Sequence, residues 1–124
     1  MVFDFTGKRA IVCGGSRGIG RAVAAGFAAS GAAVSICARG ADTLEATRAE
    51  LAAGGAKVHA APCDLADAAA IARYIGDAAA ALGGIDILVN NASAFASADT
   101  AEAWAASLQV DLMAVVHASH AALP

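Results

Sequence analysis

Short apolar runs alternate with longer alanine-rich stretches along the whole chain, and this alternation constrains the fold more than any other feature. The short runs predict strands over residues 9–13, 33–38, 57–62 and 86–90. The longer stretches, with apolar residues at helical spacing, predict helices over 19–30, 42–53, 67–82 and from about 100 onward. Strands that alternate with helices pair in parallel through right-handed crossovers. The sequence therefore predicts an α/β fold, a doubly wound parallel sheet with helices on both faces.

Residues that begin and end helices support these boundaries. The segment 42–45, Asp-Thr-Leu-Glu, has the pattern of a capping box at the start of the second helix. Gly31 follows the first helix, and glycine pairs at 54–55 and 83–84 follow the second and third. Pro124 is expected to end the last helix.

The composition fits one globular domain over residues 1–124, because 59% of the residues are hydrophobic and only 15% are charged. The net charge is −3 and the eight basic residues form no run, which argues against a nucleic-acid partner. Asp4 stands where a signal peptide carries basic residues, and no stretch has the composition of a membrane span. We therefore expect a cytoplasmic protein with no membrane partner.

Cysteine and histidine are too few and too scattered to predict a metal site. Cys13, Cys37 and Cys63 lack the C-x-x-C spacing of a zinc site and lie in or just after predicted strands. We expect buried free thiols, with a reactive thiol at the mouth of a cofactor cleft as the alternative. His117 and His120 lack a third ligand.

Residues 14–20, Gly-Gly-Ser-Arg-Gly-Ile-Gly, join the first predicted strand to the first predicted helix. Such a junction brings unpaired backbone N–H groups and the positive end of a helix dipole to one point, which attracts anions. A pyrophosphate reaches these N–H groups most easily where no Cβ stands in the way. The alternative is that the glycines serve only the positive φ of a turn. The position after the first strand favours dinucleotide binding.

Further polar residues follow the later strands, at the sheet edge where ligands bind in open parallel sheets. Arg39 stands where an NAD-binding chain usually has an acid, and with Arg17 it would bind the 2′-phosphate of NADP. Alternatively both arginines are solvated surface charges. Asp64 would accept from an adenine amino group or else begin the third helix. The segment 90–93, Asn-Asn-Ala-Ser, would border the cofactor ribose or satisfy loose backbone groups.

These motifs together resemble the short-chain dehydrogenase/reductase family. Residues 14–20 resemble its T-G-x-x-x-G-x-G motif, with Cys13 in the place of threonine. Residues 86–92 resemble its D-[IV]-L-V-N-N-A-G segment, with Ser93 in the place of the glycine. The resemblance extends over almost the whole chain. It implies a Rossmann-type cofactor-binding domain and hydride transfer between NADP(H), with NAD(H) as a possible substitute, and a small carbonyl or alcohol substrate.

The resemblance implies a role for each matching residue. The pyrophosphate and the adenosine side would be contacted by Gly14, Ser16, Arg17, Gly18, Ile19 and Gly20. Arg39 would contact the 2′-phosphate. Asp64 and Leu65 would contact the adenine. Asn91 and Ala92 would contact the ribose.

The family's catalytic residues have one counterpart in this sequence. Trp104 and Asp111 match the family's spacing from a tryptophan to a helix asparagine that assists a proton relay. Asp111 is therefore the candidate catalytic residue, or else an ordinary polar residue of the helix. The family's Y-x-x-x-K has no match, because Ala78 stands four positions after Tyr74, the only tyrosine. We therefore expect the cofactor-binding half of such an enzyme, inactive alone, with a non-catalytic dinucleotide-binding or interaction module as the alternative.

The predicted last helix has more apolar surface than one packing face needs. One stripe along it consists of Trp104, Leu108, Leu112, Val115 and Ser119. The resemblance implies an oligomer contact through this helix, so we expect a homo-oligomer. The fourth strand is expected to be an unpaired apolar edge.

Overall fold

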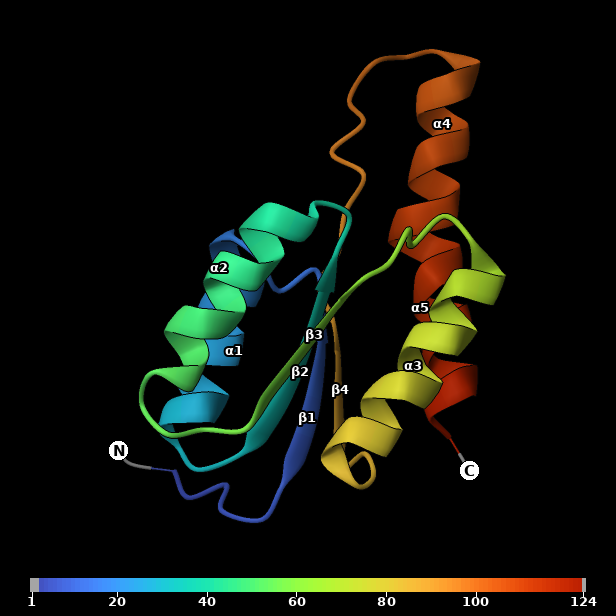
Figure 1. Cartoon of the computed structure of the whole chain (residues 1–124). Helices are drawn as coiled ribbons and strands as arrows, with labels where there is room; N and C mark the ends of the chain where they lie inside the picture. The colour runs from blue at the N-terminus through green and yellow to red at the C-terminus, as the bar shows by residue number, and fades with distance from the viewer. Residues whose placement is uncertain (1–2, 124) are drawn as a thin grey trace.

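The computed structural model of the chain describes residues 3–123 and consists of a parallel sheet between two layers of helices (Figure 1). The strands are β1 (Arg9–Cys13), β2 (Ala33–Ala38), β3 (Val58–Pro62) and β4 (Ile87–Asn90). The helices are α1 (Gly18–Ala29), α2 (Ala41–Ala52), α3 (Ala68–Leu82), α4 (Ala101–Ser107), the π-helical segment η1 (Leu108–Met113) and α5 (Ala114–Ala122). The order in the sheet is β3-β2-β1-β4, with all neighbours parallel. The predicted doubly wound α/β fold is confirmed.

The two faces of the sheet are buried by different helices, as the alternation of side chains along a strand requires. In Figure 1, α1 and α2 cover one face and α3 and α5 cover the other. The core on the α1–α2 side contains Val12, Ala24, Val34, Ile36, Leu44 and Leu51. The core on the α3–α5 side contains Ile11, Cys13, Cys37, Ile71, Ile75 and Ala118. Because both faces are covered, β1 and β2 are apolar along nearly their whole length.

Two local predictions differ from the structure. The predicted capping box at 42–45 is wrong, because α2 begins at Ala41 after an extended Gly40 and has no side-chain cap. Asp42 therefore lies inside the first turn, where its charge still complements the helix dipole. The single helix predicted from about residue 100 is divided by η1 into α4 and α5.

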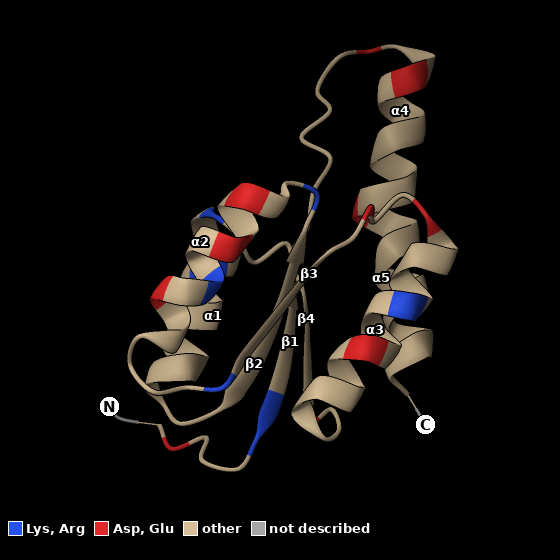
Figure 2. Ribbon diagram, viewed as in Figure 1, with Lys and Arg blue, Asp and Glu red and all other residues tan. Residues whose placement is uncertain are grey.

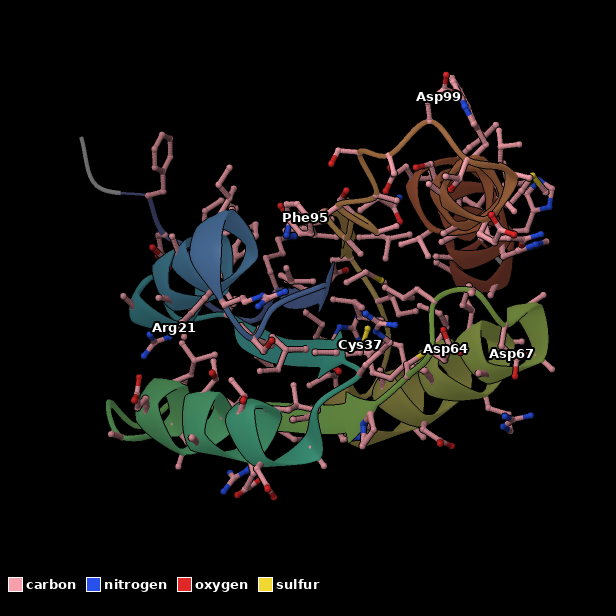
Figure 3. The ribbon with its side chains drawn as sticks, turned by 90° about the horizontal axis from the view of Figure 1, so that it is seen from above. Arg21, Cys37, Asp64, Asp67, Phe95 and Asp99 are labelled. Carbon is pink, nitrogen blue, oxygen red and sulfur yellow. The ribbon has the colours of Figure 1, made fainter. Side chains whose placement is uncertain are left out.

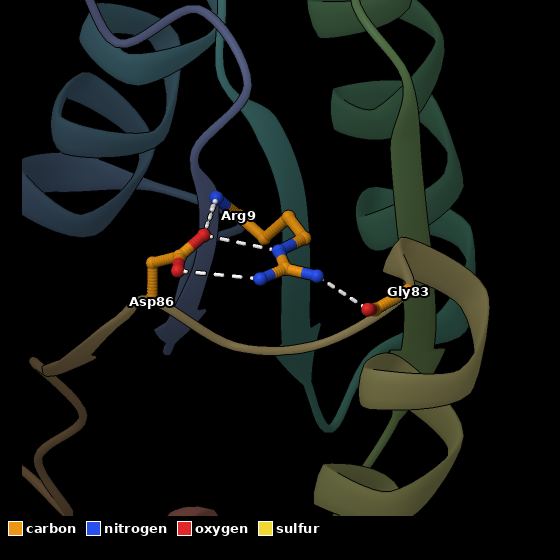
Figure 4. Close-up of polar contacts among 3 residues, drawn as sticks. All are labelled: Arg9, Gly83 and Asp86. Atoms are coloured by element: carbon orange, nitrogen blue, oxygen red, sulfur yellow. Dashed lines mark hydrogen bonds and ion pairs between the residues drawn. The ribbon is translucent and has the colours of Figure 1, made fainter.

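Arg9 and Asp86 join the amino ends of β1 and β4 (Figure 4). The backbone N–H and Nε of Arg9 donate to Oδ2 of Asp86 at 2.9 and 3.0 Å, and a guanidinium N–H donates to the carbonyl of Gly83. The hydrogen bond from Arg9 lowers the pKa of Asp86 below its ordinary value. Figure 2 shows that most charged positions lie on the helices and around the strand ends, away from the interior of the sheet.

A buried polar contact connects β2, β3 and α3. The hydroxyl of Ser35 lies 2.6 Å from the hydroxyl of Tyr74 and 2.8 Å from Nδ1 of His59. Tyr74 is only 3% exposed, and burial raises the pKa of its hydroxyl well above the ordinary value. The only tyrosine of the chain thus belongs to the core of the α3 side. Within residues 3–123, every helix is too short or too polar to cross a membrane.

Candidate functional site

The candidate site lies at the carboxyl edge of the sheet, beside the central strand β1. The chain proceeds outward from β1 to β2 and β3, and then returns to place β4 on the other side of β1. The connection after β1 leads to α1 on one face, and the connection after β4 leads toward α4 on the other (Figure 1). Connections that diverge in this way leave a crevice, and this switch point is where open α/β sheets bind ligands.

Residues 14–20 comprise the connection between β1 and α1 and the first residues of α1, and contacts from three neighbouring segments hold them in place. The N–H groups of Gly14 and Gly15 donate to the carbonyl of Cys37 in β2 at 3.0 and 3.2 Å. The Thr47 hydroxyl of α2 donates to the carbonyl of Ser16 at 3.0 Å. The Asn91 side chain, after β4, donates to the carbonyl of Gly14 at 3.2 Å. The loop is therefore ordered before any ligand arrives.

Glycine is required in this loop for two different structural reasons. A Cβ on Gly14 would lie 3.0 Å from Cα of Ala92, and a Cβ on Gly20 would overlap the carbonyl of Gly14 and the side chain of Asn91. These two positions are restricted by packing inside the protein. Gly18 has φ of +60° and nothing within 4 Å of its Cβ position, so only here does the missing side chain leave space open. Contact of all three glycines with a pyrophosphate stays a prediction.

The N-terminus of α1 has the features of an anion site. Its N-cap residue, Arg17, is extended and makes no side-chain hydrogen bond to the helix, and the first turn contains no acid. The first N–H groups therefore receive no side-chain cap, and the helix dipole adds to their positive potential. Ser16 is half-buried, whereas Ile19 is 77% exposed. This end of the helix is open to a ligand.

Arg17 and Arg39 lie at the same edge of the sheet. Arg17 precedes α1 and Arg39 directly follows β2, and both are exposed. In the described part of the chain, the ion pairs use Arg9, Arg21 and Arg48 instead. The side chain of Arg21 pairs with Glu50 on α2, so it points away from this edge. Two guanidinium groups are thus left for an anion.

The segment after β3 is stabilised by its own turn. Oδ1 of Asp64 accepts from the N–H of Ala66 at 3.0 Å, and Asp67 is the residue that caps α3, accepting from Ala69 and Ala70. Leu65 is 7% exposed and packs in the core with Cys13 and Cys37. Asp64 therefore stabilises the turn that precedes α3, and the predicted contact of Asp64 and Leu65 with an adenine stays a prediction.

The segment after β4 is fixed by Asp111 of η1, whose carboxylate accepts from the N–H of Ala94 at 2.8 Å. Segments of π-helix often occur at functional sites, and Asp111 lies within one. Phe95, the next residue of the loop, has φ of +52° and is 79% exposed. Figure 3 shows Phe95 above the sheet, between α1 and the α4 layer.

Sequence reasoning did not single out Thr47 and Phe95, although both belong to this edge. Nothing in the sequence near Thr47 indicates the loop that it holds, since its partner, Ser16, lies 31 positions away. The exposed position and strained backbone of Phe95 also have no sequence pattern that would reveal them.

The three cysteines are buried free thiols, as the sequence predicts. A hydrogen bond with Cys13, together with burial, raises the pKa of Cys37 to about 12. Within residues 3–123, no group of three or more His, Cys, Asp or Glu side chains is arranged to hold a metal ion.

The described residues form a wide cavity of about 490 Å³ at the opposite, amino edge of the sheet, lined by residues that include Lys8, Arg9 and Lys57. The cavity at the carboxyl edge, lined by residues that include Cys13, Asn90 and Ala92, holds only about 10 Å³. In the described residues the carboxyl edge presents the exposed N-terminus of α1 with Arg17 and Arg39, and its cavity is small. Its chemistry, with N–H groups and two arginines, suits a phosphate-bearing ligand that lies across it.

Comparison with known proteins identifies dehydrogenases and reductases as relatives of this chain. The family model described as short chain dehydrogenase matches residues 8–124. A 3-oxoacyl-[acyl-carrier-protein] reductase of rhamnolipid biosynthesis from Pseudomonas aeruginosa is 41% identical over 86% of this chain and 38% of its own length. A 2-dehydro-3-deoxy-L-rhamnonate dehydrogenase (NAD(+)) from Sphingomonas is 43% identical over 71% of this chain and 34% of its own length.

A solved structure of a short-chain dehydrogenase from Burkholderia cenocepacia in complex with NADP superimposes with a TM-score of 0.89. It is 43% identical and covers 94% of this chain, which corresponds to 50% of that chain. The present chain thus spans half the length of the solved relative and between a third and two fifths of the two curated ones. The family model matches nearly all residues, and the fold and the glycine loop agree with it. The chain therefore belongs to the short-chain dehydrogenase/reductase family.

Proposed function

We propose that this chain binds NADP(H) along the carboxyl edge of its sheet. The observation that supports this most directly is the open N-terminus of α1, where a loop held from three sides presents N–H groups without a side-chain cap. The pyrophosphate would lie on residues 14–20, and the adenine near Asp64 and Leu65. The ribose would lie at Asn91 and Ala92. The nicotinamide, when bound, supplies or accepts a hydride.

The preference for NADP over NAD rests on Arg17 and Arg39. Both are exposed at the edge where the adenosine ribose would lie, and the acid that would accept from a 2′-hydroxyl is absent after β2. A charge-assisted hydrogen bond of about 1.5 to 3 kcal/mol corresponds to a preference of roughly ten- to a hundredfold. The Burkholderia relative was solved with NADP, whereas the name of the Sphingomonas relative specifies NAD(+), so NAD(H) stays the alternative.

Titration calorimetry with NADPH and NADH tests this preference. We expect NADPH to bind roughly ten- to a hundredfold more tightly, and Arg39→Asp to reverse the order. Arg73→Asp is the matched control, because Arg73 is exposed on α3 and the substitution changes the net charge equally. Equal affinities in the wild type, or an equal effect of both substitutions, would contradict the role of Arg39.

We also propose that the activity served by this site is hydride transfer between NADP(H) and a carbonyl or alcohol substrate. The family supports this class of reaction. Asp111 would take the position of the family's helix asparagine and orient the loop after β4 through its bond to Ala94. The 124 residues alone are expected to bind the cofactor without turning over a substrate, because Tyr74, the only tyrosine, is used in the core.

We further propose that two copies associate through the helical layer formed by α4, η1 and α5. An apolar stripe on this layer is largely exposed: Trp104 by 62%, Leu108 by 52%, Leu112 by 53% and Val115 by 38%. A continuous apolar stripe of this kind is typical of a protein–protein contact.

A further inference from the structure

Phe95 has a backbone conformation that a bulky side chain disfavours. Among residues 3–123 it is the only non-glycine residue with a positive φ, which is +52°. In this left-handed region the Cβ of an L-residue comes too close to the backbone. Strain of this kind persists only where the surrounding structure imposes it, and it is found most often at active sites and ligand sites. Other segments must therefore hold the backbone at Phe95.

Hydrogen bonds on both sides of Phe95 provide this restraint. The N–H of Ala94 donates to the carboxylate of Asp111 at 2.8 Å, and the hydroxyl of Ser107 donates to the carbonyl of Ala96 at 3.5 Å. Asp111 lies in η1, and Ser107 is the last residue of α4. Two helical segments thus fix the residues that flank Phe95.

The ring of Phe95 gains little burial in return for this strain. Phe95 is 79% exposed and belongs to neither core cluster. None of the aromatic ring pairs within residues 3–123 includes it. Ile19, in the first turn of α1, is 77% exposed, and these two are the most exposed large apolar residues of the described chain. Both belong to the carboxyl edge of the sheet, so this edge presents apolar as well as basic groups.

The place of Phe95 relative to the proposed cofactor follows from the strand order β3-β2-β1-β4. The residues proposed for the adenosine follow β2 and β3, and the N-terminus of α1, proposed for the pyrophosphate, follows the central strand β1. A dinucleotide that crosses the edge in this order continues toward β4 with its nicotinamide half. Phe95 lies in the segment after β4, and Figure 3 shows it above the sheet between α1 and the α4 layer. Its ring would therefore lie at the reacting end of the cofactor.

We propose that Phe95 is a specificity-determining residue that favours carbonyl or alcohol substrates with an aromatic group beside the reacting carbon. This inference rests on the proposed function, because the substrate has to approach the nicotinamide. An aromatic group there packs against the ring of Phe95 and removes apolar surface of both from water. A small aliphatic substrate leaves most of the ring exposed. Because the flanking residues already fix the backbone of Phe95, binding costs little further ordering of the loop.

The test compares an aromatic ketone with a small one in the presence of saturating NADP⁺, which cannot reduce either. Titrations of the 124-residue chain with 4′-fluoroacetophenone and with fluoroacetone, followed by ¹⁹F NMR, give the two dissociation constants. Phe95→Ala is expected to weaken binding of the aromatic ketone roughly two- to tenfold and to leave fluoroacetone unchanged. Phe95→Tyr keeps an aromatic ring and is expected to retain the wild-type preference. Phe3→Ala is the matched control, since Phe3 is 59% exposed at the other end of the chain.

Phe95→Gly separates a role in specificity from a role in the fold. Glycine adopts a positive φ without the steric penalty, so this variant is expected to unfold at a higher urea concentration than the wild type. It is also expected to lose the preference for the aromatic ketone. A lower urea midpoint would instead make Phe95 a structural residue and would contradict the proposed role.

The role of Phe95 is also contradicted if Phe95→Ala keeps the wild-type affinity for 4′-fluoroacetophenone, or if Phe3→Ala loses as much affinity. Calorimetric titration of the wild type with NADPH distinguishes this result from a failure of the proposed function. A wild type that binds NADPH but does not prefer the aromatic ketone contradicts only the specificity. A wild type that does not bind NADPH contradicts the proposed cofactor site, and the role of Phe95 with it.

Discussion

Gly20 shows how closely the segments of the proposed cofactor edge approach one another. It lies in the first turn of α1, and the place of its missing Cβ is taken by the carbonyl of Gly14 and the side chain of Asn91. The close approach allows Asn91 to donate to Gly14 and so connects the segment after β4 to the loop after β1. A glycine here is therefore needed by the protein itself, before any ligand is considered.

Substitution of Gly20 by alanine tests this packing. Gly20→Ala is expected to destabilise the fold by about 1–3 kcal/mol, because the new methyl group forces the loop and the helix apart. Gly26→Ala, in the same helix, has nothing within 4 Å of its Cβ position and is expected to stabilise the fold by up to about 1 kcal/mol. Urea unfolding measures both changes. A similar change in the free energy of unfolding for both variants would contradict the packing role of Gly20.

Some residues of the candidate site can be predicted from the sequence because their signal is local. Gly18, Arg17 and Arg39 each follow or precede a recognisable strand, so their place at the edge follows from the parallel topology. The bonds of Thr47 to Ser16 and of Asn91 to Gly14 connect residues 31 and 77 positions apart. Such pairs depend on how whole helices and strands are placed relative to one another, and a local sequence pattern holds no information about that placement.

At the scale of the elements, the contact of Ser35, Tyr74 and His59 joins two strands and a helix on the α3 side of the sheet. His59 lies on β3, the edge strand, and its ring stacks against that of Tyr74. Burial lowers the pKa of His59 below its ordinary value of 6.5, and the opposing effect of Asp77 is smaller. The folded protein therefore favours the neutral imidazole more than the unfolded chain does.

The stability of the fold should accordingly depend on the charge of His59. Because the pKa is lower in the folded state, the unfolded chain binds more protons, and stability falls as the pH drops through 6.5 toward the folded pKa. The slope should stay below about 1.4 kcal/mol per pH unit, the limit for one proton. Urea unfolding between about pH 8 and about pH 5 measures it. His59→Gln should remove most of this slope, and an unchanged slope in that variant would assign the pH dependence to other groups.

The four strands and the first three helices can be predicted from the sequence, because apolar periodicity and glycine boundaries mark them within one or two residues. The division of the last helix cannot, since η1 contains neither glycine nor proline. It coincides with the bond of Asp111 to Ala94, a tertiary contact. The capping box at 42–45 fails for a related reason, because the extended Gly40 starts the helix earlier than the side-chain pattern indicates.

At the scale of the whole molecule, two surfaces leave apolar side chains exposed or only half-buried. β4 is an edge strand of half-buried apolar residues, as the sequence predicts. The stripe on α4, η1 and α5 is the larger of the two, with Trp104 as its most exposed member. Both are surfaces where further protein would find apolar contacts.

The proposed association through the helical stripe can be measured by analytical ultracentrifugation. Leu108→Lys is expected to weaken self-association about tenfold or more, because it places a charge in the middle of the stripe. Phe3→Lys is the control, since Phe3 is 59% exposed but lies at the other end of the chain. A wild-type chain that stays monomeric at high concentration, or an equal effect of both variants, would contradict the proposal.

We propose that a nucleotide with a 2′-phosphate lies along the carboxyl edge of the sheet, and not in the wider cavity at the amino edge. The most direct test is the map of backbone amide chemical shifts in ¹H–¹⁵N spectra of the chain, recorded with NADP⁺ and then with NAD⁺. Both nucleotides are expected to shift the amide signals of residues 14–20 and 90–92, and the difference between the two spectra is expected to be confined to Arg17, Arg39 and their neighbours. Shifts centred on Lys8 and Lys57, or no difference between the two nucleotides, would contradict it.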